Sequence, residues 1–311
     1  MLDVTRLRVL VAVARYGSVT AAARALNYAQ PSVSHHLARL ESETGTKLVQ
    51  RAGRGIRLTD AGRLLAERAA EVIGRLDAAE NELAAYTGLR AGRLRLAAFP
   101  SALGTIVPAA AAFLRGSNPG VDLRLTEAEP PEALRMLRAG YVDVALTFRH
   151  TLDAATPLAG EEDEDVDVTK GLRERLLLEE PVLLVTSARE PLTDPPDLSK
   201  YAKHRWIAGC DRCRAHLLAQ CTLAGFPPKI AFTTDDYVAV QALVAADLGV
   251  SMLPGLCMRS ARHPGVRTAP LPGTRRYVYA VRYGDPPDPP AVTELMDALH
   301  AAAEPPLQSP A

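Results

Sequence analysis

A long amphipathic repeat at residues 65–86 constrains the architecture of this 311-residue chain more than any other feature of its sequence. Alternating steps of four and three separate its apolar residues, which are Leu65, Ala69, Val72, Leu76, Ala79, Leu83 and Tyr86. A period of about 3.5 residues places one apolar seam along a helix, and a second helix must cover that seam. Thr59 offers a cap and Gly88 an end, so residues 59–88 form a linker helix. Because no neighbouring segment offers a partner, we expect the seam to dimerise two copies of the chain; the alternative is a helix packed on its own domain.

Three short helices are expected before the linker, within residues 1–58. Apolar residues recur at helical spacing through 4–14, and Ser18 then offers an N-cap for a second, alanine-rich helix. Asn27 tolerates the left-handed conformation that ends a helix. Pro31 suits the first turn of a third helix, which follows almost at once.

The third predicted helix has two different faces. Val33, Leu37 and Leu40 recur at spacings of four and three and form a buried stripe. The opposite face mixes hydrogen-bonding groups with one alanine, as a helix against base edges requires, and consists of Pro31, Ser34, His35, Ala38 and Arg39. Two short runs at 47–50 and 56–58, joined by Ala52-Gly53-Arg54-Gly55, predict a hairpin wing with a basic tip.

The formal charge of the whole chain is zero, but it is unevenly distributed. Residues 1–58 contain nine Arg or Lys and three Asp or Glu, so the remainder carries the compensating negative charge. A small basic domain ahead of an acidic remainder is typical of a module that faces phosphates. An uneven distribution can also arise by chance.

Beyond Gly92 the pattern changes to short apolar runs separated by helical stretches. Such alternation indicates an α/β domain with mainly parallel strands. The predicted strands are Leu94–Phe99, Val121–Thr126, Val142–Phe148, Pro181–Thr186 and Ile230–Phe232. We expect a solvated acidic loop at 161–165, a turn at 285–290 before a last helix, and a flexible tail at 304–311.

The composition predicts a soluble cytoplasmic protein. The sequence lacks an uncharged apolar run of about 18 residues and a signal-peptide pattern, so no membrane contact is expected. The cysteines are sparse for a disulfide scaffold and fit a reducing compartment; they are Cys210, Cys213, Cys221 and Cys257.

Cys210 and Cys213, with His216 and Cys221 nearby, leave three interpretations open. They are buried or unremarkable thiols, a redox sensor, or a zinc site, because one helix turn brings positions three apart onto one face. No second paired motif completes a metal signature, so we predict neither a metal nor a cofactor.

One motif of the N-terminal region is unusually specific in spacing and residue types. It runs Gln30-Pro31-Ser32-Val33-Ser34-His35-His36-Leu37-Ala38-Arg39-Leu40-Glu41, followed by Gly45, Leu48, Arg51 and Leu58-Thr59-Asp60-Ala61-Gly62. This motif closely resembles the LysR family of transcriptional regulators. Three further segments resemble family signatures, and they are Gly92 to Ala98, Ala139 to Ala145 and Leu243 to Pro254. The resemblance therefore covers essentially the whole chain. One departure is Val49, where the family usually carries Phe, which changes local packing.

The resemblance implies a multidomain fold. An all-α winged helix-turn-helix at 1–58 and the linker helix at 59–88 precede an α/β effector domain at 92–303. That domain is similar to periplasmic solute-binding proteins, with two subdomains crossed twice by the chain. We expect subdomain I at about 92–165 plus 268–303 and subdomain II at about 170–266. The resemblance also implies a homodimer on an interrupted inverted repeat of promoter DNA, further assembled into a tetramer.

The motif positions imply nine DNA-contacting residues. Base-edge contacts are expected from Gln30, Pro31, Ser34 and His35, with His36 and Arg39 on the flank. Phosphate or minor-groove contacts are expected from Ser32, Arg51 and Arg54. The alternative is that the adjacent histidines and the wing arginines are surface residues without this role.

Phe99-Pro100-Ser101 closes the first predicted strand and opens a helix, at the sheet edge where α/β proteins bind anions and polar ligands. The resemblance places a small-molecule effector in the cleft between the subdomains. The expected lining is Ser101, Glu129, Phe148, Arg149, Cys210, Asp211 and Arg212. Arg149 or Arg212 would pair with an effector carboxylate. Alternatively, Ser101 is only an N-cap and Arg149 neutralises the acidic loop.

Two other function classes fit the sequence less well. An enzyme would need a nucleophile with its base, a metal cluster or a phosphate loop, and none occurs at motif spacing. A sequence-tolerant architectural DNA protein would not need an α/β cleft domain. We therefore predict a transcriptional regulator that is not an enzyme.

Overall fold

The computed structural model describes residues 2–52, 55–86, 93–151 and 171–303. It divides into two compact units: one holds the N-terminal elements with Arg135–Asp143, and the other holds the rest. The predicted acidic loop at 161–165, the tail at 304–311 and Arg54 lie outside the described residues.

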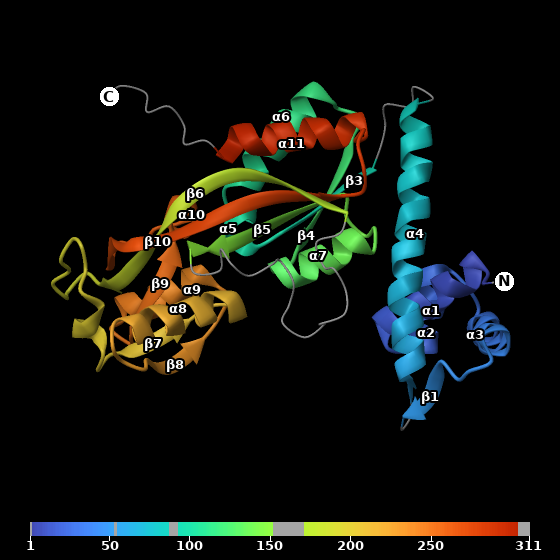
Figure 1. Ribbon diagram of the computed structural model, residues 1–311, viewed down its shortest axis with the longest axis horizontal. Coiled ribbons are helices and arrows are strands. Elements are labelled where there is room, and N and C mark those ends of the chain that lie inside the picture. Colours follow the sequence, from blue (N-terminus) through green and yellow to red (C-terminus); the bar gives the residue numbers. More distant parts are fainter. Residues whose placement is uncertain (1, 53–54, 87–92, 152–170, 304–311) are drawn as a thin grey trace. The chain divides into compact units, whose positions relative to one another are not determined.

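The N-terminal unit contains the predicted helices and wing (Figure 1). Its elements are α1 (Val4–Tyr16), α2 (Val19–Leu26), α3 (Gln30–Thr44), β1 (Val49–Ala52), β2 (Gly55–Leu58) and α4 (Asp60–Tyr86). Ser18 accepts a hydrogen bond from the Ala21 backbone N–H and caps α2, and Asn27 ends α2 with a φ of 55°. These are the cap and the left-handed exit that the sequence predicted.

The core of this unit draws one face from each helix. Val33, Leu37 and Leu40 of α3 are buried among residues of α1 and α2. The first half of α4 completes the core through Ala66, Ala69 and neighbouring side chains. The start of the linker helix is therefore part of the same hydrophobic core as the helix-turn-helix.

The second unit is built on one curled mixed sheet of eight strands, in the order β4-β3-β5-β10-β6-β9-β7-β8. Its strands are β3 (Arg93–Ala98), β4 (Asp122–Glu127), β5 (Val144–His150), β6 (Leu172–Ser187), β7 (Arg205–Ala208), β8 (Lys229–Thr233), β9 (Val250–Pro254) and β10 (Val266–Tyr283). Its helices are α5 (Pro100–Leu103), α6 (Ile106–Ser117), the 3-10 turn η2 (Leu198–Tyr201), α8 (Asp211–Leu223), α9 (Tyr237–Ala245), α10 (Gly255–Ser260) and α11 (Pro290–Ala303). A further helix, α7 (Pro130–Arg138), begins in this unit and ends within the Arg135–Asp143 segment of the other unit.

The sheet has two parallel triplets, β4-β3-β5 and β8-β7-β9, joined by an antiparallel centre. The long strands β6 and β10 run side by side through that centre (Figure 1). β6 contributes side chains to two hydrophobic cores. Leu177 belongs to the core that includes residues of β3 and β5, whereas Val182 belongs to the core around Trp206. The prediction of a mainly parallel sheet is thus correct for the triplets and wrong for the centre.

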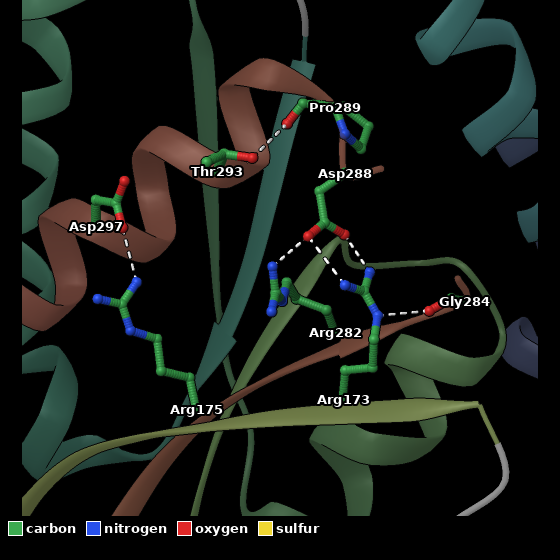
Figure 2. A network of polar contacts seen from close by, with 8 residues as sticks. All are labelled: Arg173, Arg175, Arg282, Gly284, Asp288, Pro289, Thr293 and Asp297. Carbon is green, nitrogen blue, oxygen red and sulfur yellow. Dashed lines mark hydrogen bonds and ion pairs between the residues drawn. The ribbon is translucent and has the colours of Figure 1, made fainter. Parts of the chain in front are cut away.

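Charged side chains anchor the last helix to the long strands (Figure 2). Asp288, just before α11, pairs with both Arg173 of β6 and Arg282 of β10. Farther along α11, Asp297 accepts a hydrogen bond of 2.7 Å from Arg175. The Pro-rich stretch therefore ends in a polar anchor that fixes where α11 begins, and α11 packs beside α6.

Candidate functional site

The outer face of α3 is exposed over most of its length. Gln30, Pro31, Ser32, Ser34, His35, Ala38 and Arg39 are all exposed. Within the described residues, no side chain caps the N-terminus of α3, which leaves its positive end available to an anion. Polar groups, a small residue and a free helix N-terminus are together suited to lie against DNA.

His36 and the wing arginines are placed differently. His36 is half-buried, because its ring stacks on Tyr28 with centroids 5.9 Å apart. It therefore faces its own domain more than the seven exposed residues of α3 do. Arg51 lies on β1, and its side chain, like Arg54, is outside the described residues.

Glu41 ties the wing to the recognition helix. Its Oε1 accepts hydrogen bonds from the backbone N–H groups of Leu48 (2.9 Å) and Val49 (3.2 Å), and its Oε2 pairs with Lys47 at 2.7 Å. Burial raises the pKa of Glu41, but these hydrogen bonds outweigh burial and hold the pKa below its usual value. The carboxylate therefore fixes the start of β1 relative to α3.

Only part of the predicted apolar seam on α4 is exposed. Ala69 is buried in the core of its own unit, and Leu65 packs against that core partly buried. Val72, Leu76 and Leu83 are exposed by 48%, 41% and 67%. Ala79 between them is also exposed, and the side chain of Tyr86 is outside the described residues. An apolar stripe at steps of four and three thus faces outward over the second half of α4.

A pocket in the second unit lies where the two parallel triplets end. Ser101 and Glu129 follow β3 and β4, while Cys210 and Asp235 follow β7 and β8. The cavity measures about 50 Å³, which leaves room for roughly three to five water molecules. The carboxyl edge of parallel strands is a common place for ligand binding in α/β folds.

Four of the seven predicted effector residues line this pocket: Ser101, Glu129, Phe148 and Cys210. Arg149 does not, because adjacent residues on a strand point to opposite faces and Phe148 occupies the pocket side. Arg149 instead donates to both carboxylate oxygens of Glu174 at 2.7 Å and lies over the ring of Tyr279.

Asp211 and Arg212 are likewise absent from the described pocket lining. Both occupy the first turn of α8, just past the pocket residue Cys210. Neither predicted carboxylate partner, Arg149 or Arg212, therefore reaches the cavity.

The cation of the pocket is Arg276 of β10, which sequence reasoning missed. Its side chain is 2% exposed and lies between the rings of Phe99 and Phe148, at 5.0 and 4.8 Å from their centroids. It pairs with Glu180 at 2.6 Å and donates a hydrogen bond of 3.0 Å to the Ser101 hydroxyl. Ser101 is thus a partner of Arg276, and α5 has no side-chain cap.

Glu180, Glu129 and Asp235 carry the negative charge of the pocket region. Glu180 accepts a hydrogen bond from the Leu256 backbone N–H at 2.5 Å and neutralises Arg276. Burial raises the pKa of Glu129, and the neighbouring Cys210 thiol opposes that rise. One oxygen of Glu129, Oε2, is buried without a hydrogen-bond partner in the described structure. A ligand with a hydrogen-bonding group can satisfy that atom.

A winged helix-turn-helix joined to an α/β domain with a polar pocket defines the class of ligand-responsive DNA-binding regulators. The model of the "Bacterial regulatory helix-turn-helix protein, lysR family" matches residues 4–63, and that of the "LysR substrate binding domain" matches residues 87–304. The chain belongs to the LysR family and is a transcriptional regulator with a DNA-binding domain and an effector-binding domain.

Individual relatives agree with this assignment over most of their length. The chain is 27% identical to the probable HTH-type transcriptional regulator LrrA of Synechococcus elongatus, covering 97% of this chain and 98% of that protein. It is 32% identical to a probable hydrogen peroxide-inducible genes activator of Mycobacterium avium, covering 86% and 85%. The crystal structure of full-length CbnR with its target DNA has the same fold, with a TM-score of 0.62, 20% identity, and coverage of 97% and 100%.

None of the helices in the described residues combines the length and the apolar character needed to span a bilayer.

Proposed function

We propose that two copies of this regulator bind an interrupted inverted repeat in promoter DNA, with one α3 helix in the major groove of each half-site. The observation that carries the proposal is the outer face of α3, which is polar, exposed and open at its N-terminus. Base edges are read by Gln30, Pro31, Ser34 and His35, with Arg39 and the partly buried His36 on the flank. Phosphates are contacted by Ser32, Arg51 and Arg54.

The dimer is held by the stripe of α4 that the chain itself leaves uncovered. Its members in the described structure are Val72, Leu76, Ala79 and Leu83, and Tyr86 continues the same spacing. A second α4 of the same sequence offers the matching seam. Two such dimers assemble into a tetramer, as the family resemblance implies.

The effector is a small molecule that enters the pocket beside Arg276. Ser101, Glu129, Phe148 and Cys210 contact it, and Arg276 takes the part first expected of Arg149 or Arg212. A carboxylate is the favoured effector group, received by Arg276 and by protonated Glu129. The cavity of about 50 Å³ must widen for most metabolites, which gives binding a means to alter the second unit.

The protein acts in the cytoplasm as a regulator without catalysis. Its family and its relatives are transcriptional regulators, which supports this assignment. A ligand that the protein binds should therefore be recovered unchanged.

A gel-shift and footprinting series on the promoter region beside the coding sequence tests the proposal. We expect a protected dyad, and the Ser34→Ala/His35→Ala double variant should lose it while remaining folded by circular dichroism. Salt-sensitive binding without a preferred site would replace sequence recognition with an architectural role. Absence of binding at low salt would contradict the proposed role of α3.

A further inference from the structure

Two cysteines of the pocket lie in direct contact. The Sγ atoms of Cys210 and Cys213 are 3.2 Å apart, and both side chains are partly exposed and line the cavity. Among the described residues, no group of three His, Cys, Asp or Glu side chains is arranged to hold a metal ion. A pair of thiols at this distance, without further ligands, has a different chemistry from a zinc site.

Local structure holds the two thiols together. Cys210 is the N-cap of α8 and Cys213 lies in its first turn, so one helical turn brings their side chains to the same face. Gly209 precedes them, and a Cβ at that position would lie 3.3 Å from the Cβ of Cys213. A disulfide has an S–S length of about 2.05 Å, so the two sulfurs need to approach by roughly 1 Å.

We propose that Cys210 and Cys213 form a reversible dithiol–disulfide pair within the pocket, oxidised by a small hydroperoxide. The proposal concerns the thiols alone and depends neither on the identity of the effector nor on DNA binding. A hydroperoxide is the oxidant because the cavity of about 50 Å³ admits molecules only slightly larger than water.

The geometry assigns different roles to the two sulfurs. The Cys210 thiol donates a hydrogen bond to the Cys213 sulfur, and this hydrogen bond favours Cys213 over Cys210 as the thiolate when one of the two protons is lost. That hydrogen bond, together with burial, raises the pKa of Cys210. Cys213 is the acceptor and lies in the first turn of α8, where the helix dipole stabilises negative charge. Cys213 is therefore the nucleophile and Cys210 is the resolving thiol.

The reaction balances as a two-electron oxidation. The Cys213 thiolate attacks one oxygen of hydrogen peroxide, which breaks the O–O bond, gives Cys213 sulfenic acid and releases hydroxide. The hydroxide takes up the Cys210 proton, and the Cys210 sulfur attacks the sulfenic sulfur, which forms the S–S bond. The sulfenic oxygen leaves as hydroxide and takes up the proton that Cys213 released on becoming a thiolate, which gives the second water molecule. Two thiols and one peroxide thus yield one disulfide and two water molecules, and a dithiol reductant reverses the change.

The other two cysteines are built-in controls. Cys221 is fully buried in the core around Trp206, and Cys257 is 3% exposed. Burial raises the pKa of each of these thiols to about 12. Both are therefore expected to stay reduced while the exposed pair reacts.

Oxidation changes the pocket as well as the thiols. The disulfide has no S–H group, so Glu129 loses the thiol neighbour that favours its ionised form. The thiol state thereby sets which polar groups a ligand meets.

The test uses the full-length protein, reduced and then freed of reductant. Hydrogen peroxide is added in small excess, and free thiols are counted under denaturing conditions, with intact mass and peptide mapping in parallel. We expect the four thiols of the reduced protein to fall to two, the mass to drop by two hydrogens, and the disulfide to join Cys210 to Cys213. Dithiothreitol should restore all four, and the Cys221→Ala control should still lose two.

Single variants separate the two roles. Cys210→Ser should accumulate a dimedone-reactive sulfenic acid on Cys213, whereas Cys213→Ser should react at least about tenfold more slowly. Circular dichroism of each variant shows that it is folded. Oxidation that adds oxygen without removing two hydrogens, or a disulfide that joins other cysteines, would overturn the proposal.

Discussion

Removing the positive charge of Arg276 while leaving Glu180 in place should strongly destabilise the second unit. The two residues face each other across β6 and β10, with side chains 2% and 6% exposed. Arg276→Met fills much of the same space between Phe99 and Phe148 but leaves a buried carboxylate without its cation. Breaking a buried ion pair in this way costs about 3–5 kcal/mol. For a unit of roughly 200 residues, this lowers the melting temperature by about 6–20 °C.

The rescue variant makes this prediction specific. Glu180→Gln removes the stranded charge in the Arg276→Met background and keeps an oxygen for the Leu256 backbone N–H. The double variant should recover about 2–3 kcal/mol of the loss, because only a neutral hydrogen-bonding group then remains buried.

The single tryptophan, Trp206, is fully buried in the second unit and reports its unfolding by fluorescence. Urea titrations of the wild type, Arg276→Met, Glu180→Gln and the double variant give the interaction free energy of the pair. A loss below about 1 kcal/mol in Arg276→Met, or no recovery in the double variant, would refute the argument that this is a buried and mutually dependent pair.

Three further predictions concern the N-terminal unit. Glu41→Gln should lower the unfolding free energy by about 1–2 kcal/mol near neutral pH, measured by urea titration. Because the folded pKa of Glu41 is lowered, its stabilisation exists above the unfolded pKa and is lost as pH falls through the folded pKa, so the two proteins should converge in acid. Leu76→Glu should shift the protein toward monomer in sedimentation experiments, whereas Leu64→Glu, also exposed on α4 but off the stripe, should not. Gly62→Ala should destabilise by more than about 2 kcal/mol in the same urea titration, because its Cβ would lie 2.0 Å from the backbone oxygen of Leu48, just before β1. The control Gly116→Ala meets no atom within 4 Å and should be neutral.

The helix-turn-helix could be predicted in detail because its information is local. Ser18 and Asn27 act within one turn of the helices that they begin and end, and Val33, Leu37 and Leu40 carry the helical period themselves. The repeat on α4 is also a local pattern, but the pattern does not show which part of the helix packs in its own unit and which part is left exposed. Leu65 and Ala69 obey the same spacing as Leu76, yet they pack in their own core, because α1 lies over the first half of α4.

The pocket was only partly predictable because its parts meet through the sheet. Residues that directly follow a strand, such as Ser101 and Cys210, could be placed at the carboxyl edge from the strand pattern alone. The prediction that Arg149 lines the pocket together with Phe148 was wrong, and the strand period already argued against it, because adjacent residues on β5 point to opposite faces of the sheet. No local sequence pattern marked Arg276 as a pocket residue. It reaches the pocket only through the register of β10 against β6, which pairs it with Glu180, a residue far away in the sequence.

The ion pair between Arg276 and Glu180 affects which effectors the pocket can bind. Arg276 is the only Lys or Arg among the described pocket residues, and Glu180 already compensates its charge. A carboxylate that enters beside Arg276 therefore competes with Glu180 and also meets Glu129. Protonation of Glu129 removes one of these repulsions and converts an unpartnered oxygen into a donor. Because burial raises the pKa of Glu129, an anionic effector should bind more tightly as pH falls toward that pKa, and Glu129→Gln should remove most of this dependence. A neutral effector would gain nothing from the proton, so the pH dependence of binding distinguishes the two classes of ligand.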